Sequence, residues 1–234
     1  ESEAKLKGVE AFAIECAIAK IHGSEVLDYV VDQGVQVYGG MGYSADAPME
    51  RAYRDARISR IYEGTNEINR MLMVGMLLKR AMKGEIDLFG PAMAVSAELT
   101  GVPSFETVDT SELFAAEKDV LKKLKKVFLM VGGKAAMALQ DKIEDEQEVM
   151  MNLADVMIEI YAAESGLLRA EKLVGMKGEA ACQNQIAMAQ IYLSEAVDKI
   201  AVAAKEAIGS FTKGDEQKVM LMGLKRYTKA DLID

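Results

Sequence analysis

The sequence contains few of the residues that break helices or build small β folds. Its 234 residues include three prolines, no tryptophan and 6% aromatic residues. Sandwiches and barrels of short strands need many turns and many β-favouring side chains, so this composition argues against them and favours helices. Half of the residues are hydrophobic and 28% are charged, a balance typical of a globular protein rather than of a disordered one.

Histidine and cysteine are almost absent, which disfavours several kinds of site. The single histidine, His22, and the two distant cysteines, Cys16 and Cys182, form no metal-ligand spacing, so no metal site is expected. Both cysteines lie in apolar helical patterns, which predicts buried, reduced thiols. The net charge of -9 opposes binding to a phosphate backbone, so no nucleic-acid partner is expected.

Long apolar runs are absent as well. The longest wholly apolar stretch covers residues 71–78, whereas a membrane-spanning helix needs about 20 such residues. The chain begins with Glu1, and no charged segment followed by an apolar one marks a secretory signal. We therefore expect an excised piece of a longer protein that does not cross a membrane.

Helical periodicity covers most of the first third of the chain. Predicted helices span residues 9–21 and 24–38, separated by Gly23 and with Ser24 capping the second. A short helix begins with Pro48 at its first position, and another runs from about residue 66 to Gly84. Residues 85–106 hold two glycines and two prolines and show no sustained period, which predicts a boundary between domains.

Three long amphipathic stripes follow that boundary, at residues 113–131, 149–168 and 186–207. A helical tail is predicted after Gly214. Short connections between long helices imply antiparallel packing, so this half of the chain is predicted to form a helical bundle. The fold class predicted for the whole chain is therefore all-α.

The densest group of chemistry-bearing residues lies between residues 36 and 70. A turn containing Gly39, Gly40 and Gly42 follows one predicted helix and can bring a ligand close to the backbone. Glu63 precedes the start of the next helix, where unpaired N–H groups can bind an anionic or polar ligand. A tight turn followed by a helix cap would leave the same pattern, so the residues alone leave both interpretations open.

This segment resembles the C-terminal domain of the acyl-CoA dehydrogenases. The agreement has no gap and includes Gln36, Gly39, Gly40, Gly42, Tyr43, Asp46, Arg51, Asp55 and the quartet Tyr62-Glu63-Gly64-Thr65. Residues 12–25 resemble the very-long-chain branch of the family, as does the extra helical region after Gly84. The resemblance implies an incomplete acyl-CoA dehydrogenase C-terminal helical bundle in residues 1–88, lacking its first helix, and an additional antiparallel helical domain in residues 89–234.

The resemblance also implies a role for each matched residue. Glu63 matches the family's catalytic base, which removes a proton from the α-carbon of an acyl-CoA thioester while a hydride leaves the β-carbon for FAD. Its backbone N–H matches a donor to the thioester carbonyl. Tyr62 matches a residue that lines the acyl pocket, and Gly64 leaves room for the thioester. The remaining matches are to FAD contacts: Thr65 and Glu67, and Gln36, Gly39 and Gly40 toward the adenine-diphosphate part of FAD held by a neighbouring subunit.

The function implied is that of the C-terminal portion of an FAD-dependent acyl-CoA dehydrogenase acting on long-chain fatty acyl-CoA in β-oxidation. Electron-transferring flavoprotein would be the electron acceptor and the enzyme would be a homodimer, cytoplasmic in a bacterium or mitochondrial in a eukaryote. Much of the flavin site would lie outside the chain, so we expect the isolated chain to be inactive and to bind FAD weakly or not at all.

Other functions stay open at this point. An acyl-CoA oxidase uses the same base but passes its electrons to oxygen. The helical second half could instead be a non-catalytic module for dimerisation or for docking on a membrane. Five lysines between residues 118 and 126 lie largely opposite an apolar stripe, which is typical of a solvated face and also of a patch for anionic lipids.

Overall fold

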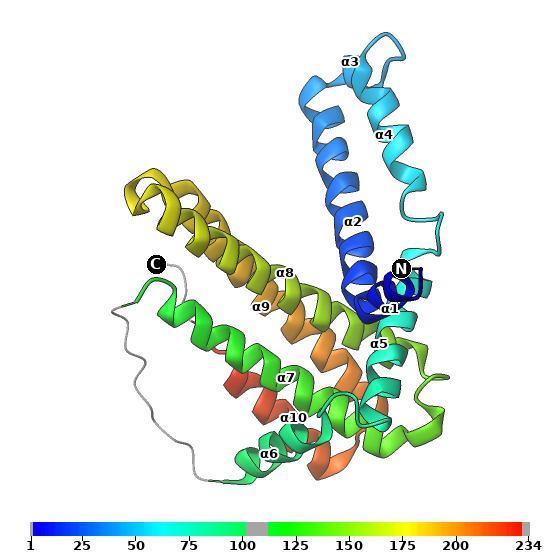
Figure 1. The fold of residues 1–234 in the computed structure, drawn as a ribbon, viewed down its shortest axis with the longest axis vertical. Coiled ribbons are helices and arrows are strands. Elements are labelled where there is room, and N and C mark those ends of the chain that lie inside the picture. Colours follow the sequence, from blue (N-terminus) through cyan, green and yellow to red (C-terminus); the bar gives the residue numbers. More distant parts are fainter. Residues whose placement is uncertain (1, 102–111, 231–234) are drawn as a thin grey trace. The chain divides into compact units, whose positions relative to one another are not determined.

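The structure is a computed structural model that describes residues 2–101 and 112–230, and its regular elements in those ranges are all helices (Figure 1). The all-α prediction is therefore confirmed. The chain divides into two compact units, Glu1–Leu77 and Leu78–Asp234, and each is described by itself below. This division falls within a helix, and the domain boundary expected after residue 88 stays a prediction.

The first unit is built around one long helix. Helix α1 (Ser2–Ala11) leads into α2 (Ala13–Tyr38), the short helix α3 (Gly40–Tyr43) reverses the chain, and α4 (Pro48–Ile58) returns along α2. Helix α5 (Asn66–Met82) begins in this unit. Pro48 stands at the first position of α4, as predicted. Figure 1 shows α2 and α4 side by side.

The break predicted at Gly23 is wrong, because α2 continues without interruption from Ala13 to Tyr38. A glycine inside a helix costs only about 1 kcal/mol relative to alanine. The buried residues Ile21 and Val31 on either side of it contribute more than that. Ser24 is not an N-cap but a buried residue of the helix interior, and its hydroxyl donates to the Ile21 carbonyl at 2.9 Å.

The two cysteines differ in burial. Cys182 is buried, with 1% of its surface exposed, as predicted. Cys16 is exposed on α2, so the prediction of a buried thiol is wrong at that position. Apolar residues spread around much of α2, and within this chain its neighbours cover only part of that circumference, since Tyr29 and Val37 are exposed too. An apolar helical pattern therefore overestimates the burial of Cys16.

The second unit is a bundle of long helices. Helix α7 (Ala115–Leu139) leads through a short 3₁₀ turn (Gln140–Lys142) to α8 (Gln147–Lys177), and a second turn (Glu179–Ala181) leads to α9 (Gln183–Phe211). Helices α8 and α9 form an antiparallel hairpin that packs on α7, and α10 (Gly214–Tyr227) contacts both α7 and α9 (Figure 1). The three predicted stripes and the tail after Gly214 are confirmed.

The sequence pattern missed one helix of this unit. Helix α6 (Phe89–Thr100) lies within the stretch predicted to be irregular and packs on α7. Pro91 stands in the first turn of α6, where its missing N–H has no intrahelical partner to lose. Ala92 and Val95 are buried. Proline at this place marks the start of a helix rather than its absence.

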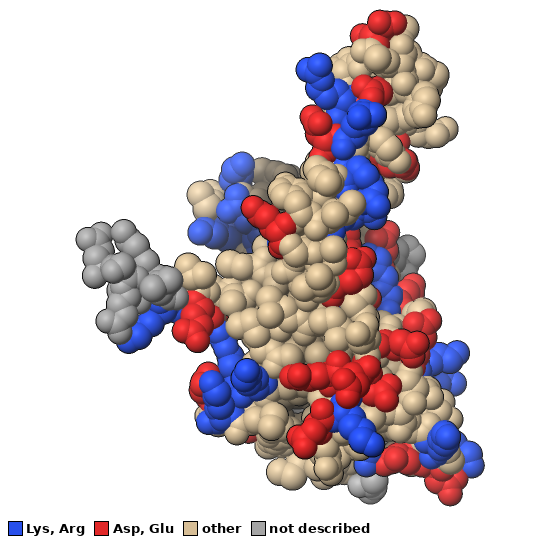
Figure 2. Space-filling view, turned by 90° about the vertical axis from the view of Figure 1, so that its right-hand side faces the viewer, with Lys and Arg blue, Asp and Glu red and all other residues tan. Residues whose placement is uncertain are grey.

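Four of the five lysines between residues 118 and 126 have acidic partners within their own unit. Lys118 pairs with Glu171 at 2.6 Å, Lys125 pairs with Glu164 at 2.6 Å, and a third pair joins Lys126 to Glu98 at 2.7 Å. On the face drawn in Figure 2, blue and red side chains lie in small mixed groups, with no broad area of one sign. These pairs favour an ion-paired surface over a patch for anionic lipids. Among the described helices, none has both the length and the apolar character that crossing a bilayer requires.

Candidate active site

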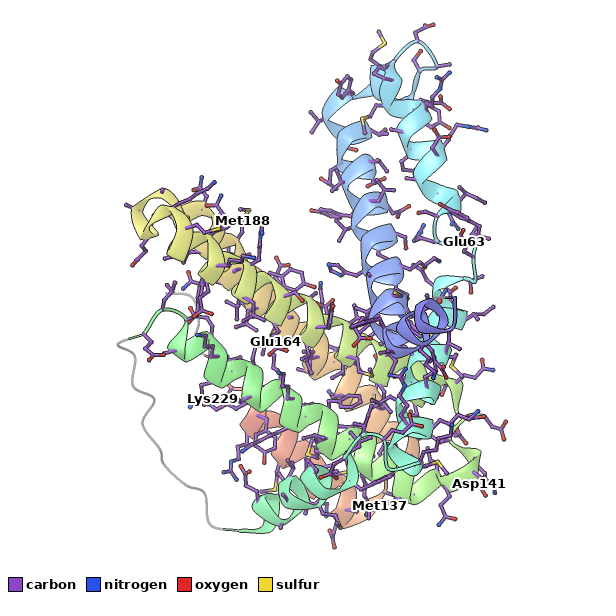
Figure 3. The ribbon with its side chains drawn as sticks, in the orientation of Figure 1. Glu63, Met137, Asp141, Glu164, Met188 and Lys229 are labelled. Carbon is purple, nitrogen blue, oxygen red and sulfur yellow. The ribbon has the colours of Figure 1, made fainter. Side chains whose placement is uncertain are left out.

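The loop between α4 and α5 carries Glu63 (Figure 3). The N–H groups of Ile61 and Tyr62 donate to the Ile58 carbonyl at 2.9 and 3.2 Å, which ends α4 with a tight turn. The N–H of Asn66 donates back to the Arg60 carbonyl at 3.1 Å and closes the loop. Tyr62 and Glu63 lie between these bonds and are exposed. The loop therefore presents both side chains away from the chain's own core.

The backbone of this loop is strained at Glu63. Glu63 has φ of 56° and the next residue, Gly64, has φ of 81°. The left-handed region is open to glycine but costs other residues about 1 kcal/mol or more. A Cβ on Gly64 would also lie 3.0 Å from Asn69 Nδ2. Backbone strain of this kind collects at functional sites, so Glu63 is a candidate on structural grounds as well as by resemblance.

Hydrogen bonds to three successive carbonyls hold the strained loop. The Asn69 side-chain amide donates to the Gly64 carbonyl at 2.8 Å, to the Thr65 carbonyl at 3.1 Å and, more weakly, to the Glu63 carbonyl at 3.5 Å. The Lys20 amine of α2 donates to the same Gly64 carbonyl at 2.8 Å. The loop is therefore held from its own helix and from a second one.

A polar network joins α2 to the first turn of α5. Asn66 is 2% exposed; its Oδ1 accepts from the Lys20 amine at 2.7 Å and its Nδ2 donates to Ser24 Oγ at 2.9 Å and to Glu25 Oε1 at 3.2 Å. Glu25 also forms a two-pronged ion pair with Arg70, at 2.8 and 3.2 Å. Buried polar groups that are fully paired specify a unique geometry. From the sequence, Ser24 and Asn66 were predicted only as helix caps, and Lys20, Glu25 and Arg70 were given no role.

The N–H groups at the start of α5 are already occupied, which corrects the expectation that they are free for a ligand. Thr65 caps the helix, its Oγ1 accepting from the Ile68 N–H at 3.2 Å. The pKa of Glu67 lies below its usual range because the carboxylate accepts from its own backbone N–H and from the Thr65 hydroxyl, with Arg70 and Arg60 adding favourable charge. The N–H of Asn66 is used in closing the loop. An anionic ligand would therefore compete with Glu67 at this helix start.

The predicted FAD-contact residues form two separate groups. Thr65 and Glu67 adjoin the Glu63 loop, whereas Gln36, Gly39 and Gly40 lie at the far end of α2, where Gly39 ends the helix with φ of 61°. Lys20, which contacts the Glu63 loop, precedes Gln36 by sixteen residues on that helix, or about 24 Å at 1.5 Å per residue. The structure therefore does not bring the two groups together within one chain.

Glycines at the α2–α3 corner differ in what they contact. A Cβ on Gly42 would lie 2.7 Å from the Val35 carbonyl oxygen, so the fold itself requires glycine there. A Cβ on Gly40 would meet nothing within 4 Å, and Gly40 and Gln36 are exposed. The fold of this chain gives no reason for glycine at position 40. In the described part of the chain, no group of three or more His, Cys, Asp or Glu side chains is placed to hold a metal ion.

Two family models match this chain, and each carries the description "Acyl-CoA dehydrogenase, C-terminal domain". One matches residues 2–78 and the other residues 123–226. The chain belongs to the acyl-CoA dehydrogenase family. The first match coincides with the first compact unit, and the second lies inside the second unit.

Individual acyl-CoA dehydrogenases match nearly the whole chain. A probable acyl-CoA dehydrogenase of Bacillus subtilis (strain 168) is 40% identical over 223 residues, which is 95% of this chain and 37% of the relative. A solved structure, an acyl-CoA dehydrogenase from Bacillus anthracis complexed with FAD, matches with a TM-score of 0.89 and 40% identity over 95% of this chain and 37% of that one. The chain thus spans little more than a third of these relatives.

Acyl-CoA dehydrogenases of different chain-length specificity match to different extents. The very long-chain specific enzyme of Rattus norvegicus mitochondria is 29% identical over 241 residues, covering 96% of this chain and 36% of the relative, so that branch is a distant match. The short-chain specific enzyme of Bos taurus mitochondria is 52% identical over only 68 residues, 29% of this chain. The short-chain match is too short to include the second unit.

Proposed function

We propose that the protein to which this chain belongs is an FAD-dependent acyl-CoA dehydrogenase and that Glu63 is its catalytic base. The observation that carries the proposal is the left-handed backbone of Glu63, held by Lys20 and Asn69 in an exposed loop. A glutamate that is both exposed and kept in an unfavourable backbone conformation is a candidate for a functional role. Glu63 would remove the proton on the α-carbon of an acyl-CoA thioester.

The backbone of Glu63 supplies a second feature that this reaction needs. Proton removal next to a thioester places negative charge on its carbonyl oxygen, and a fixed N–H donor stabilises that charge. Within the described residues, no acceptor receives a bond from the Glu63 N–H, in contrast to the N–H groups of Asn66 and Ile68. The loop therefore keeps one donor available beside the proposed base. Tyr62 would line the acyl pocket, and Gly64 would leave room for the thioester.

The residues at the other end of α2 fit the adenine-diphosphate part of FAD. When bound, FAD supplies the chemistry of hydride acceptance. Gln36 is exposed, and the backbone at Gly39 and Gly40 is open to a close approach. Because this end lies far along α2 from Glu63, these contacts fit an FAD whose reactive ring belongs to a different site, as in a dimer. Thr65 and Glu67 would contact the FAD of the Glu63 site itself.

The role of Gly40 can be separated from that of Gly42 by one pair of alanine variants. Gly40→Ala in the whole protein should leave the melting temperature of the FAD-free form unchanged and weaken FAD retention about tenfold, since a methyl group would intrude on the ligand. Gly42→Ala should instead lower the melting temperature, because its Cβ would meet the Val35 carbonyl. Equilibrium dialysis of FAD and thermal unfolding measure the two effects. Wild-type FAD affinity in Gly40→Ala would remove Gly40 from the proposed site.

For the substrate we propose a long-chain acyl-CoA, with electron-transferring flavoprotein as the electron acceptor. The support is that the match to the very long-chain specific relative covers 96% of this chain, whereas the match to the short-chain relative covers 29% of it. The test is anaerobic addition of palmitoyl-CoA, and separately of butyryl-CoA, to the purified whole protein loaded with FAD. Palmitoyl-CoA should bleach the oxidised flavin and butyryl-CoA should do so far more slowly. A flavin that stays oxidised with both compounds would refute the proposed activity.

A further inference from the structure

The direction of the Glu63 side chain depends on the two left-handed residues at the loop. Glu63 and Gly64 have φ of 56° and 81°. A rotation about the N–Cα bond of either residue would change the direction in which the Glu63 carboxylate points. Such a backbone returns to a commoner conformation unless its surroundings hold it. The groups that hold the peptide after Glu63 therefore decide where the proposed base points.

The carbonyl of Gly64 is the point at which this loop is held most firmly. A carbonyl oxygen accepts two hydrogen bonds, and both are used here, by Asn69 Nδ2 at 2.8 Å and by Lys20 Nζ at 2.8 Å. Asn69 belongs to α5, the helix that directly follows the loop, so it moves with the loop. Lys20 belongs to α2, 44 residues earlier in the chain. The donor in the bond from Lys20 is a positively charged ammonium group. A hydrogen bond from a charged donor is stronger than one from a neutral amide such as that of Asn69.

Lys20 is itself fixed in place. Its amine donates to Asn66 Oδ1 at 2.7 Å as well as to Gly64, and Asn66 is 2% exposed and bonded to Ser24 and Glu25. A lysine side chain is flexible on its own, but hydrogen bonds to two fixed acceptors hold Lys20 in one conformation. We infer that Lys20 is a positioning residue for Glu63: through the Gly64 carbonyl it holds the backbone in the conformation that aims the carboxylate. This inference rests on the proposed role of Glu63.

A purely structural role for Lys20 makes a different prediction. The helices α2 and α5 stay joined without Lys20, because Asn66 still bonds to Ser24 and Glu25, and Glu25 still pairs with Arg70. Removing the Lys20 side-chain nitrogen therefore leaves the helix contact in place, together with the ion pair at 3.2 Å between Asp28 of α2 and Arg60 at the start of the loop, and takes away the bond from α2 to the Gly64 carbonyl. Removal of the Lys20 donor should therefore slow catalysis and leave the stability of the fold unchanged.

The test uses the whole protein with FAD bound and the variant Lys20→Met, which keeps the length of the side chain and removes its donors. The first-order rate constant for flavin reduction at saturating palmitoyl-CoA should fall about 10- to 100-fold, as expected when a reacting group is displaced by a fraction of an ångström to 1 Å. FAD content, melting temperature and the affinity for a non-reactive acyl-CoA analogue should stay near wild type. Lys83→Met is the matched control, since Lys83 is exposed and only weakly paired with Glu85 at 3.9 Å.

Two more variants keep the result decisive. Lys20→Arg retains donors for both oxygens and should recover part of the rate, and Lys20→Leu, which also lacks a donor, replaces Lys20→Met if that variant does not fold. Wild-type flavin reduction in Lys20→Met, or a rate loss that only follows lost FAD, would overturn the inference. Glu63→Gln is measured beside them: full activity there refutes the proposed base, whereas an inactive Glu63→Gln with a fully active Lys20→Met refutes the positioning role alone.

Discussion

Glu63→Gln is expected to slow flavin reduction in the whole protein by about 10²- to 10⁴-fold, the range that a positioned general base contributes. Glutamine matches glutamate in size and keeps the backbone N–H, but it cannot accept the α-proton of the substrate. Rapid mixing with palmitoyl-CoA under anaerobic conditions measures the rate constant directly. Binding of acyl-CoA and FAD should change little, because the side chain of Glu63 is exposed and accepts no hydrogen bond from the residues that the structure describes.

Glu50→Gln is a suitable control for this experiment. Glu50 lies on α4 in the same unit and pairs at 3.5 Å with Arg54, whose side chain is 77% exposed. It loses the same charge by the same chemical change, yet it belongs to neither the Glu63 loop nor the Gly39–Gly40 corner. Glu50→Gln should therefore reduce flavin at the wild-type rate. If Glu63→Gln matched this control, the catalytic base would have to lie elsewhere.

Local sequence signals predicted the ends of helices well where the backbone preference of a single residue decides them. Pro48 begins α4 and Gly84, with φ of 74°, follows the end of α5, because both residues have backbone preferences that few neighbours can override. Gly23 and Pro91 were misleading for opposite reasons. The cost of a glycine inside α2 is small beside the burial of that helix, and a proline in the first turn of α6 is compatible with a helix.

The candidate site was only half visible in the sequence. Glu63 and the glycines stand in a continuous motif, so resemblance located them. Lys20 and Asn66 are 46 residues apart and meet only because α2 and α5 pack together. One local signal was present: Lys20 and Ser24 stand one helical turn apart on α2, beside the buried Ile18 and Ile21. Polar residues in that position need partners when buried, but no single-sequence argument identifies which partners.

The start of α5 shows how a general rule can fail at a particular residue. Helix N-termini offer unpaired N–H groups to anions, which made this one a candidate binding site. Glu67 stands in the first turn, and its carboxylate takes its own N–H and the Thr65 hydroxyl. A carboxylate supplied by the chain itself has the advantage of proximity over any ligand from solution. The proposed FAD contact of Glu67 therefore calls for the side chain to turn away from the helix start.

The second unit should be far more sensitive to Leu193→Ala than to a matched change on the same helix. Leu193 lies on α9 with none of its surface exposed, in the core between α9 and its neighbours α7 and α8. Truncating a leucine in such a core leaves a cavity and typically lowers the free energy of unfolding by about 2–5 kcal/mol. Because the chain has no tryptophan, helical circular dichroism during urea unfolding is the appropriate signal.

Ile191→Ala is the control, since Ile191 stands two residues earlier on α9 and is 50% exposed. Its removal should cost less than about 1 kcal/mol, as is usual for surface positions. A large difference between the variants means that Leu193 belongs to the packed core that stabilises the second unit. Equal losses would contradict that arrangement and place Ile191 in a contact that this chain alone does not contain. Comparing flavin reduction in the two variants then separates the stability of the second unit from the chemistry of the Glu63 loop.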